Sequence, residues 1–288
     1  MVGEHSETGA RVRRFYEELP FNFLTTKDSA SLITAKNQIQ AYADLDGVLS
    51  HSPGATVLDI GCGAGWFVNS CAFYYRLHTT GLDLTEKAIA RAAETSTELG
   101  IDELTHFVRG DLFELELDES FDVVSSIGVL HHTFSVPKAL ERAANYVAPG
   151  GALHIGLYHS YGRAPFLELF EPYRAAALAG TLSEADSEEA LSLYAELHPS
   201  ADDEFLRSWF RDQVLHPHET QHSLEEVHAL LSALGFEIFS TSINRFEPFE
   251  HIENLFELER GYEELSRQRN HIERRYFPGF FTVLARQS

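Results

Sequence analysis

The chain has 288 residues, of which 44% are hydrophobic, enough for one large α/β domain with insertions. Its formal net charge of −22 opposes association with nucleic acid or anionic lipid, so both are unfavoured as partners. No apolar run approaches the roughly 18 residues of a membrane span, residues 1–10 lack the apolar core of a signal peptide, and only two cysteines occur. These features predict a cytoplasmic protein with no membrane contact and no structural disulfide.

Residues 1–50 precede the first predicted strand and have the pattern of helices. Aromatic residues gather around Pro20, and Tyr16 is one of them. We interpret residues 1–50 as an N-terminal helical lid over a ligand, with Tyr16 as a substrate contact.

The first strand, over residues 55–60, leads into a glycine-rich turn with the sequence DIGCGAG. Such turns bind nucleotide-like ligands, but Asp59, two residues before Gly61, would repel a diphosphate. The turn therefore favours a ligand that carries positive charge beside a nucleoside. S-adenosylmethionine, with its ammonium and sulfonium groups, meets this requirement. The expected contacts of the turn are Asp59, Gly61, Cys62, Gly63 and Gly65.

The next two strands, over residues 78–84 and 104–109, each end in a carboxylate. Asp83, with Leu84 beside it, lies about 20 residues after the glycine turn, where nucleoside-binding βαβ units place an acid on the ribose hydroxyls. Asp111, followed by Leu112, is placed to accept the adenine amino group. Both carboxylates are expected at the same edge of a sheet.

Strands over residues 121–127 and 151–158 complete a regular alternation with helices, which predicts a parallel sheet. Ile127 and Gly128, at the end of the first of these strands, would form the floor beneath the reactive sulfur. Several side chains that could orient or deprotonate an acceptor follow the two strands: His131, His132, Tyr158 and His159.

Five elements occur here in one order and spacing: the DIGCGAG turn, Asp83, Gly110-Asp111, the run 126–132 and the sequence PGGAL at 149–153. Together they resemble the class I S-adenosylmethionine-dependent methyltransferases over residues 55–160. The resemblance implies that the glycine turn contacts the methionine portion, Asp83 the ribose, and Asp111 with Leu112 the adenine. It also implies a Rossmann-like seven-stranded α/β sheet whose last strand is antiparallel, with S-adenosylhomocysteine as product.

The stretch from His216 to His222 contains the spacing H-E-x-x-H, which binds zinc when both histidines lie on one helical face. Ser223 and Glu226 form a capping-box pattern, however, so the next helix begins at 223 and the stretch is predicted to be a loop. We therefore predict no metal. Three interpretations remain open: an acceptor-binding loop that uses His218, Glu219 or His222, a plain surface loop, or a zinc site.

The predicted organisation divides the chain into four parts. These are a lid at 1–50, a cofactor-binding core at 51–159, a helical insertion or acceptor cap at 160–222, and a completion of the core at 223–288. In the last part the sixth strand is expected at 236–246, a helical insertion at about 247–276, and the antiparallel seventh strand at 280–286.

The function predicted from the sequence is methylation of a small molecule on O, N, S or C by in-line transfer. The acceptor would be positioned or deprotonated by His131, His132 or His218 and bound by Tyr16, Tyr158, His159, Glu219 and His222. One alternative is an RNA or protein methyltransferase, although the fourth strand ends in SIGV rather than the Asn/Asp-Pro-Pro-aromatic run of amino-directed enzymes. The other is a cofactor-binding protein that transfers no methyl group. A homodimer is compatible with the sequence.

Overall fold

The structure is a computed structural model and describes residues 2–21, 24–199 and 203–287. A seven-stranded sheet with the order β3-β2-β1-β4-β5-β7-β6 forms its centre. β1 to β5 run parallel, and β7 is antiparallel to both neighbours, so the expected Rossmann-like sheet with an antiparallel last strand is confirmed. The strands are β1 (Thr56–Ile60), β2 (His78–Asp83), β3 (Thr105–Arg109), β4 (Phe121–Ile127), β5 (Val147–Tyr158), β6 (Phe236–Thr241) and β7 (Phe280–Gln287).

Two strand boundaries differ from the prediction by more than one residue. β5 begins at Val147, four residues early, because the Gly150-Gly151 pair lies inside the strand at an irregularity in its pairing with β4. β6 ends at Thr241 rather than 246, because a 3₁₀ turn follows and Arg245 and Phe246 both take positive φ angles of 60° and 64°. Positive φ is costly for residues with a Cβ and is incompatible with an extended strand.

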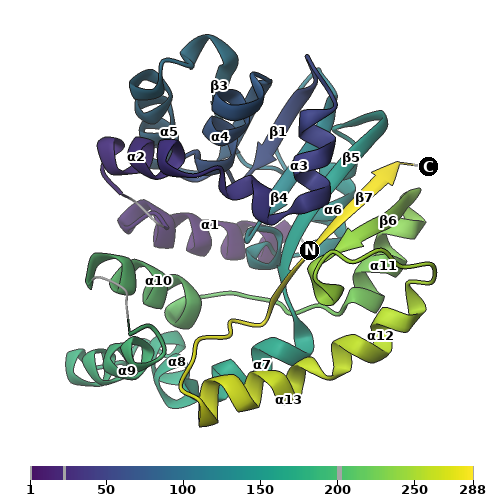
Figure 1. Cartoon of the computed structure of the whole chain (residues 1–288). Helices are drawn as coiled ribbons and strands as arrows, with labels where there is room; N and C mark the ends of the chain where they lie inside the picture. Colours follow the sequence, from purple (N-terminus) through teal and green to yellow (C-terminus); the bar gives the residue numbers. More distant parts are fainter. Residues whose placement is uncertain (1, 22–23, 200–202, 288) are drawn as a thin grey trace.

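Helices cover both faces of the sheet and extend beyond it (Figure 1). Before and within the core they are α1 (Val2–Glu18), α2 (Thr26–Ala35), α3 (Ala43–Ser50), α4 (Trp66–Tyr75), α5 (Glu86–Leu99) and α6 (Val136–Ala144). After β5 follow α7 (Ser160–Glu168), α8 (Glu171–Leu178), α9 (Glu184–Glu196), α10 (Asp203–Leu215), α11 (Leu224–Ala233), α12 (Glu253–Arg260) and α13 (Tyr262–Arg267). Short 3₁₀ segments occupy 38–41, 102–104, 130–132 and 242–244, and a π turn occupies 268–272.

The capping box that was predicted for α11 is present. The backbone N of Ser223 donates to Glu226 Oε2 at 3.1 Å, and the backbone N of Glu226 donates to Ser223 Oγ at 3.0 Å. Since this box starts the helix at 224, residues 216–222 form a loop, as expected.

The described parts of the segment, 160–199 and 203–215, are mostly helical, as the sequence indicates, and pack around an aromatic cluster that includes Phe166, Phe170, Tyr194 and Phe210. In Figure 1 helix α1 lies between the sheet half of the molecule and helix α10. Ligands of open α/β sheets bind beyond the carboxyl ends of the strands, which is the region that α1 spans.

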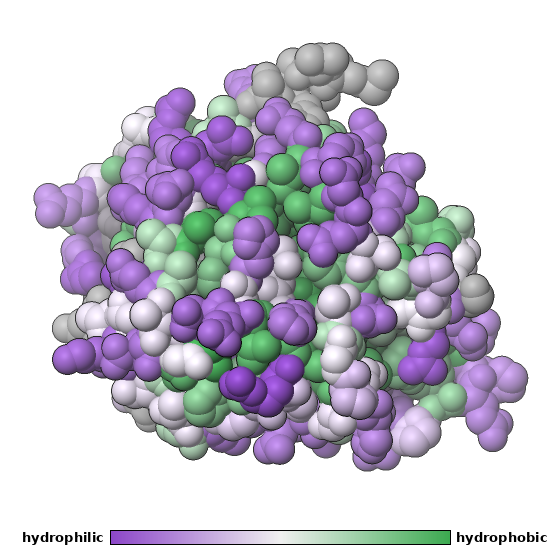
Figure 2. Space-filling model, turned by 90° about the horizontal axis from the view of Figure 1, so that it is seen from above, coloured by the Kyte–Doolittle hydropathy of each residue, from purple (hydrophilic) through white to green (hydrophobic). Residues whose placement is uncertain are grey.

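Hydrophilic side chains predominate around the periphery of the face in Figure 2, with hydrophobic ones showing between them. Within the described part of the chain, no helix is both long enough and apolar enough to cross a bilayer.

Candidate active site at the carboxyl edge of the sheet

The glycine turn after β1 is fastened to the end of β2. The backbone N–H groups of Gly61 and Cys62 both donate to the carbonyl of Leu82, at 2.7 and 2.9 Å, and the N–H of Gly63 donates to Asp83 Oδ2 at 3.0 Å. Gly61, Gly63 and Gly65 all have positive φ. The turn and Asp83 are therefore one structural unit.

Gly61 is also held to a close contact with Val129. A Cβ added at Gly61 would lie 2.4 and 2.6 Å from the two methyl carbons of Val129. We expect Gly61→Ala to lower the free energy of unfolding by roughly 2–5 kcal/mol, from the left-handed backbone and the collision together. Thermal unfolding measures this, with Gly54→Ala as the control.

Gly54 has a φ of 80° but nothing within 4 Å of an added Cβ, so it isolates the backbone contribution. Equal losses in the two variants would show that the Val129 contact is unimportant.

A buried carboxylate and a half-buried one flank the turn. Asp59, at the end of β1, is only 5% exposed, and burial followed by the charge of Asp83 raises its pKa well above the usual value. Burial also raises the pKa of Asp83, although hydrogen bonds from Thr85 and Gly63 oppose that shift. Ionising both acids in this enclosed place is costly, and a cationic ligand group would relieve the cost.

Asp111 and Leu112 follow β3 on the same edge. Asp111 Oδ1 accepts from the backbone N of Phe113 at 2.9 Å, and its Oδ2 lies 3.8 Å from Arg13 Nη2 of α1. Lys87 of α5 donates to the Glu17 carbonyl at 2.6 Å. Helix α1 is thus attached to the core beside Asp111.

Ile127 and Gly128 end β4, where Ile127 pairs with Gly156 of β5 and the N–H of Gly128 donates to the Gly156 carbonyl at 3.1 Å. Gly128 has a φ of 78°, so the chain turns sharply toward His131 and His132. This turn places the histidines at the carboxyl edge, as the sequence predicts.

A cluster of aromatic rings lies at this edge. The ring centroid of His131 is 4.3 Å from His132 and 4.0 Å from Tyr158, and His132 lies 3.6 Å from His216 in the loop after α10. All four side chains are buried. Burial lowers the pKa of each of the three histidines, so these rings are neutral near pH 7.

Hydrogen bonds to Nδ1 fix the tautomer of each ring. Nδ1 of His131 accepts from the backbone N of Tyr158 at 3.3 Å, and Nδ1 of His216 accepts from the backbone N of His218 at 3.1 Å. These two neutral rings therefore carry their proton on Nε2. His132 is the opposite case, because its Nδ1 donates to the His218 carbonyl at 2.8 Å and its Nε2 keeps a lone pair.

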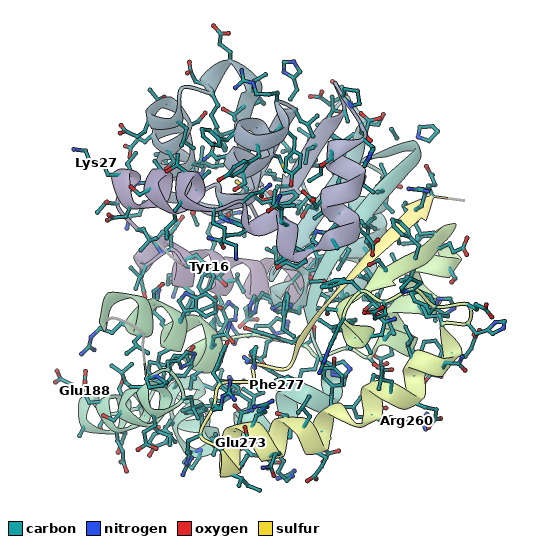
Figure 3. All side chains as sticks on the ribbon, in the orientation of Figure 1. Tyr16, Lys27, Glu188, Arg260, Glu273 and Phe277 are labelled. Atoms are coloured by element: carbon teal, nitrogen blue, oxygen red, sulfur yellow. The ribbon has the colours of Figure 1, made fainter. Side chains whose placement is uncertain are left out.

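Helix α1 closes this cluster. Tyr16 OH donates to Asp212 Oδ1 of α10 at 2.7 Å, and the ring of Phe15 lies 4.8 Å from His216, edge to face. Figure 3 shows Tyr16 between the sheet half and the helices below it. Arg211 of α10 donates to the Leu19 carbonyl and pairs with Glu18 at 2.7 Å, which attaches the end of α1 to α10.

Three of the predicted site residues form hydrogen bonds or ion pairs with other groups of the protein. His159 is fully buried, with Nε2 2.9 Å from Glu259 Oε2 and Nδ1 accepting from Gly162 N, so neither nitrogen is left for substrate. Glu219 forms a bidentate ion pair with Arg163, at 3.1 and 2.8 Å, rather than facing a ligand. His218 directs Nε2 to the Thr133 carbonyl at 3.0 Å, and its own carbonyl accepts from Nδ1 of His132 at 2.8 Å.

His222 is also engaged within the protein. Its Nε2 lies 2.9 Å from Thr220 Oγ1 and its Nδ1 lies 3.5 Å from Glu226, while its backbone pairs with the end of β5. His222 therefore holds the loop against the sheet, and its contact with substrate stays a prediction.

No local pattern in the sequence points to Asp212, Arg163 or the ring of His216 as parts of this site. Asp212 lies between Arg211 and Gln213 in an ordinary helical pattern, and Arg163 lies in the first turn of α7. His216 lies in the H-P-H-E-x-x-H stretch, but it precedes by two residues the zinc-type spacing that makes this stretch stand out. Only tertiary contacts bring these side chains to the site.

The model of a family described as "Methyltransferase domain" matches residues 51–190. These residues form a class I methyltransferase domain. The curated relatives of this domain include an uncharacterized protein of Synechococcus sp., 26% identical over 226 residues, which are 72% of this chain and 54% of that protein. A 27-O-demethylrifamycin SV methyltransferase of Amycolatopsis mediterranei is 34% identical over 113 residues, 39% of this chain and 42% of that enzyme.

The fold of the methyltransferase domain also recurs in solved structures. Magnesium protoporphyrin IX methyltransferase of Synechocystis, solved with bound S-adenosylhomocysteine, superposes with a TM-score of 0.50 at 17% identity and covers 99% of this chain and 95% of that one. At this identity the likeness shows the fold alone. The chain spans about half the length of the curated relatives it matches.

Proposed function

We propose that this protein transfers the methyl group of S-adenosylmethionine to a small molecule, with His132 as the general base. The observation that carries the proposal is the pair of carboxylates, the buried Asp59 and the half-buried Asp83, that flanks the glycine turn and whose pKa values are both raised by burial. A negatively charged turn suits a nucleoside with a cationic amino acid portion and disfavours a diphosphate.

The residues at this edge fit that cofactor. Asp59 and the turn from Gly61 to Gly65, with Cys62, would hold the methionine portion, and Asp83 with Leu84 the ribose. Asp111 and Leu112 would hold the adenine, with Ile127 and Gly128 beneath the sulfur. When bound, the cofactor supplies a methyl group on a positively charged sulfur.

The protein's own task is then to orient the acceptor and remove its proton. Nε2 of His132 has a lone pair and is buried. The ring centroid of His132 lies 4.3 Å from that of His131. The His218 carbonyl fixes the ring orientation, as a second group does for the base in other enzymes. Burial excludes water from the acceptor.

A small acceptor is supported by enclosure and by charge. Phe15 and Tyr16 of α1, together with Asp212 of α10, close over the histidines, and a small molecule can be enclosed in this way whereas a polymer cannot. The net charge of −22 opposes a polyanionic substrate such as RNA.

The cofactor assignment is tested by calorimetry with S-adenosylmethionine and with NAD. We expect binding of the former only. Asp59→Asn and Asp83→Asn should each weaken the affinity for S-adenosylmethionine by about 10- to 100-fold, because each variant loses a charge-assisted interaction. Asp102→Asn, at an exposed position, is the control.

Asp59→Asn should raise the free energy of unfolding of the ligand-free protein, although it weakens the binding of the cofactor. Because folding raises the pKa of Asp59, the cost of its carboxyl to the free energy of folding grows as the pH rises from the ordinary value of 3.8 to the raised pKa and is fully present above it, so the neutral amide should stabilise the ligand-free protein near pH 7. Preferential binding of NAD, or equal affinities in all three variants, would refute the assignment.

A further inference from the structure

Three neighbouring imidazoles each keep one buried nitrogen, Nε2 of His131, His132 and His216, that has no hydrogen-bond partner among the described residues. Such a buried group costs about 1–3 kcal/mol, so three in one cluster indicate that a ligand supplies the partners. A different pair of unbonded groups, Nδ1 of His154 and Oγ1 of Thr282, belongs to residues that line a cavity of about 10 Å³ elsewhere, which suits one water.

The hydrogen-bonding character of the three nitrogens matches a hydroxyl group. His131 and His216 each offer an N–H on Nε2, and His132 offers a lone pair. A hydroxyl has one donor and two lone pairs, which is the complementary set. A primary amine has two donors and one lone pair, so it would leave one of the N–H groups unmatched.

The strength of the base narrows the choice of hydroxyl. Burial lowers the pKa of His132, which makes it a weaker base than a solvated imidazole. A phenol, with a pKa of about 10, gives up its proton far more readily than an aliphatic hydroxyl, which is nearly as weak an acid as water at about 15.7. Aromatic rings of Phe15, Tyr16 and Tyr158 surround the histidines and suit a flat partner.

Building on the proposed function, we propose that the acceptor is a phenol that is methylated on its oxygen, with His131 and His216 donating their Nε2–H groups to that oxygen. The phenol proton passes to Nε2 of His132 and then to solvent. The oxygen–carbon bond forms as the carbon–sulfur bond of the sulfonium breaks, and the electron pair stays on sulfur to give a neutral thioether.

Tyr16 provides an internal precedent, since its own phenol lies in this cluster. Its ring centroid is 5.5 Å from that of His216, and its hydroxyl is bonded to the buried carboxylate of Asp212. Because Phe15 and Tyr16 cover the histidines, α1 must move aside to admit the acceptor and then cover it again.

The test compares three probes of one shape: 2-naphthol, 2-naphthylamine and naphthalene. Calorimetry measures their affinities for the full chain saturated with S-adenosylhomocysteine, and mass spectrometry follows methylation with S-adenosylmethionine. We expect 2-naphthol to bind at least about tenfold more tightly than naphthalene, from its added hydrogen bonds, and to be the probe that is methylated.

Variants of His216 test whether its Nε2–H donates to the hydroxyl of the probe. His216→Phe keeps a flat ring without an N–H and should remove most of the preference for 2-naphthol over naphthalene. His216→Gln, whose amide restores a donor, should recover part of it, and His251→Phe, at an exposed position, should leave it unchanged.

The outcomes separate the two proposals. A protein that fails to bind either form of the cofactor would refute the proposed function itself. If the cofactor binds but 2-naphthol has no advantage, or 2-naphthylamine is the methylated probe, the phenol inference is wrong and the methyltransferase proposal stands.

Discussion

Replacing His132 with alanine is expected to lower kcat by about 100- to 10,000-fold, the usual contribution of a positioned general base. The reason is geometric: His132 is the ring in the cluster whose Nε2 carries a lone pair, because its Nδ1 proton is committed to the His218 carbonyl. Steady-state methyl transfer measures the loss. The affinity for S-adenosylmethionine should stay the same, since the glycine turn and Asp83 are untouched.

The pH profile gives a second measure of the same residue. His132 works in its neutral form, and burial lowers its pKa from 6.5, so activity should be level near pH 7 and fall only as the pH drops below 6.5. His132→Ala should lose this acidic limb. His251→Ala, at an exposed histidine, should keep both the rate and the limb, and an unchanged rate in His132→Ala would make His132 part of the scaffold.

The parts of the site that lie on the sheet could be predicted from the sequence because strand ends are encoded locally. An apolar strand followed by Gly61 or by Asp83 leaves little freedom in where these residues go, and parallel pairing then brings the strand ends together. The glycine turn, Asp111 and His132 all lie at the expected edge for this reason.

The cap could not be predicted in the same way, because its contacts join distant segments. Tyr16 meets Asp212 across 196 positions, and His159 meets Glu259 across 100. Nothing local distinguishes a histidine that faces a ligand from one that pairs with a buried glutamate. The sequence therefore predicts neither the Glu259 contact of His159 nor the place of Asp212 beside Tyr16.

Arg163→Met is expected to be the most destabilising single change in the cap, at about 3–5 kcal/mol, because it removes both short hydrogen bonds to the buried Glu219 carboxylate and leaves that charge only the longer ion pair with Arg174, at 3.7 Å. The Arg163 side chain is fully buried and Glu219 is 3% exposed. Burial by itself acts to lower the pKa of Arg163 and to raise that of Glu219, but their mutual attraction outweighs it in both, so the pair is ionised. The guanidinium also donates to the Gln213 carbonyl and stacks 3.7 Å from the Tyr158 ring.

The matched control is Arg267→Met. Arg267 forms an equally short pair with Glu168, at 2.8 Å, but both side chains are at least 40% exposed, so its loss should cost less than about 1 kcal/mol. Thermal and denaturant unfolding compare the two variants. Similar losses in both would mean that burial adds nothing to the Arg163–Glu219 pair.

Combining Arg163→Met with Glu219→Gln should restore part of the stability, since the buried charge that Arg174 only partly compensates is then gone, while the Gln213 carbonyl still lacks its donor. The restored part measures the coupling between the two charges. The same double variant also tests a link to catalysis, because Arg163 stacks on Tyr158, whose backbone N–H fixes the tautomer of His131. A double variant that regains stability without regaining turnover would show that this arginine supports the geometry of the histidine cluster and not the fold alone.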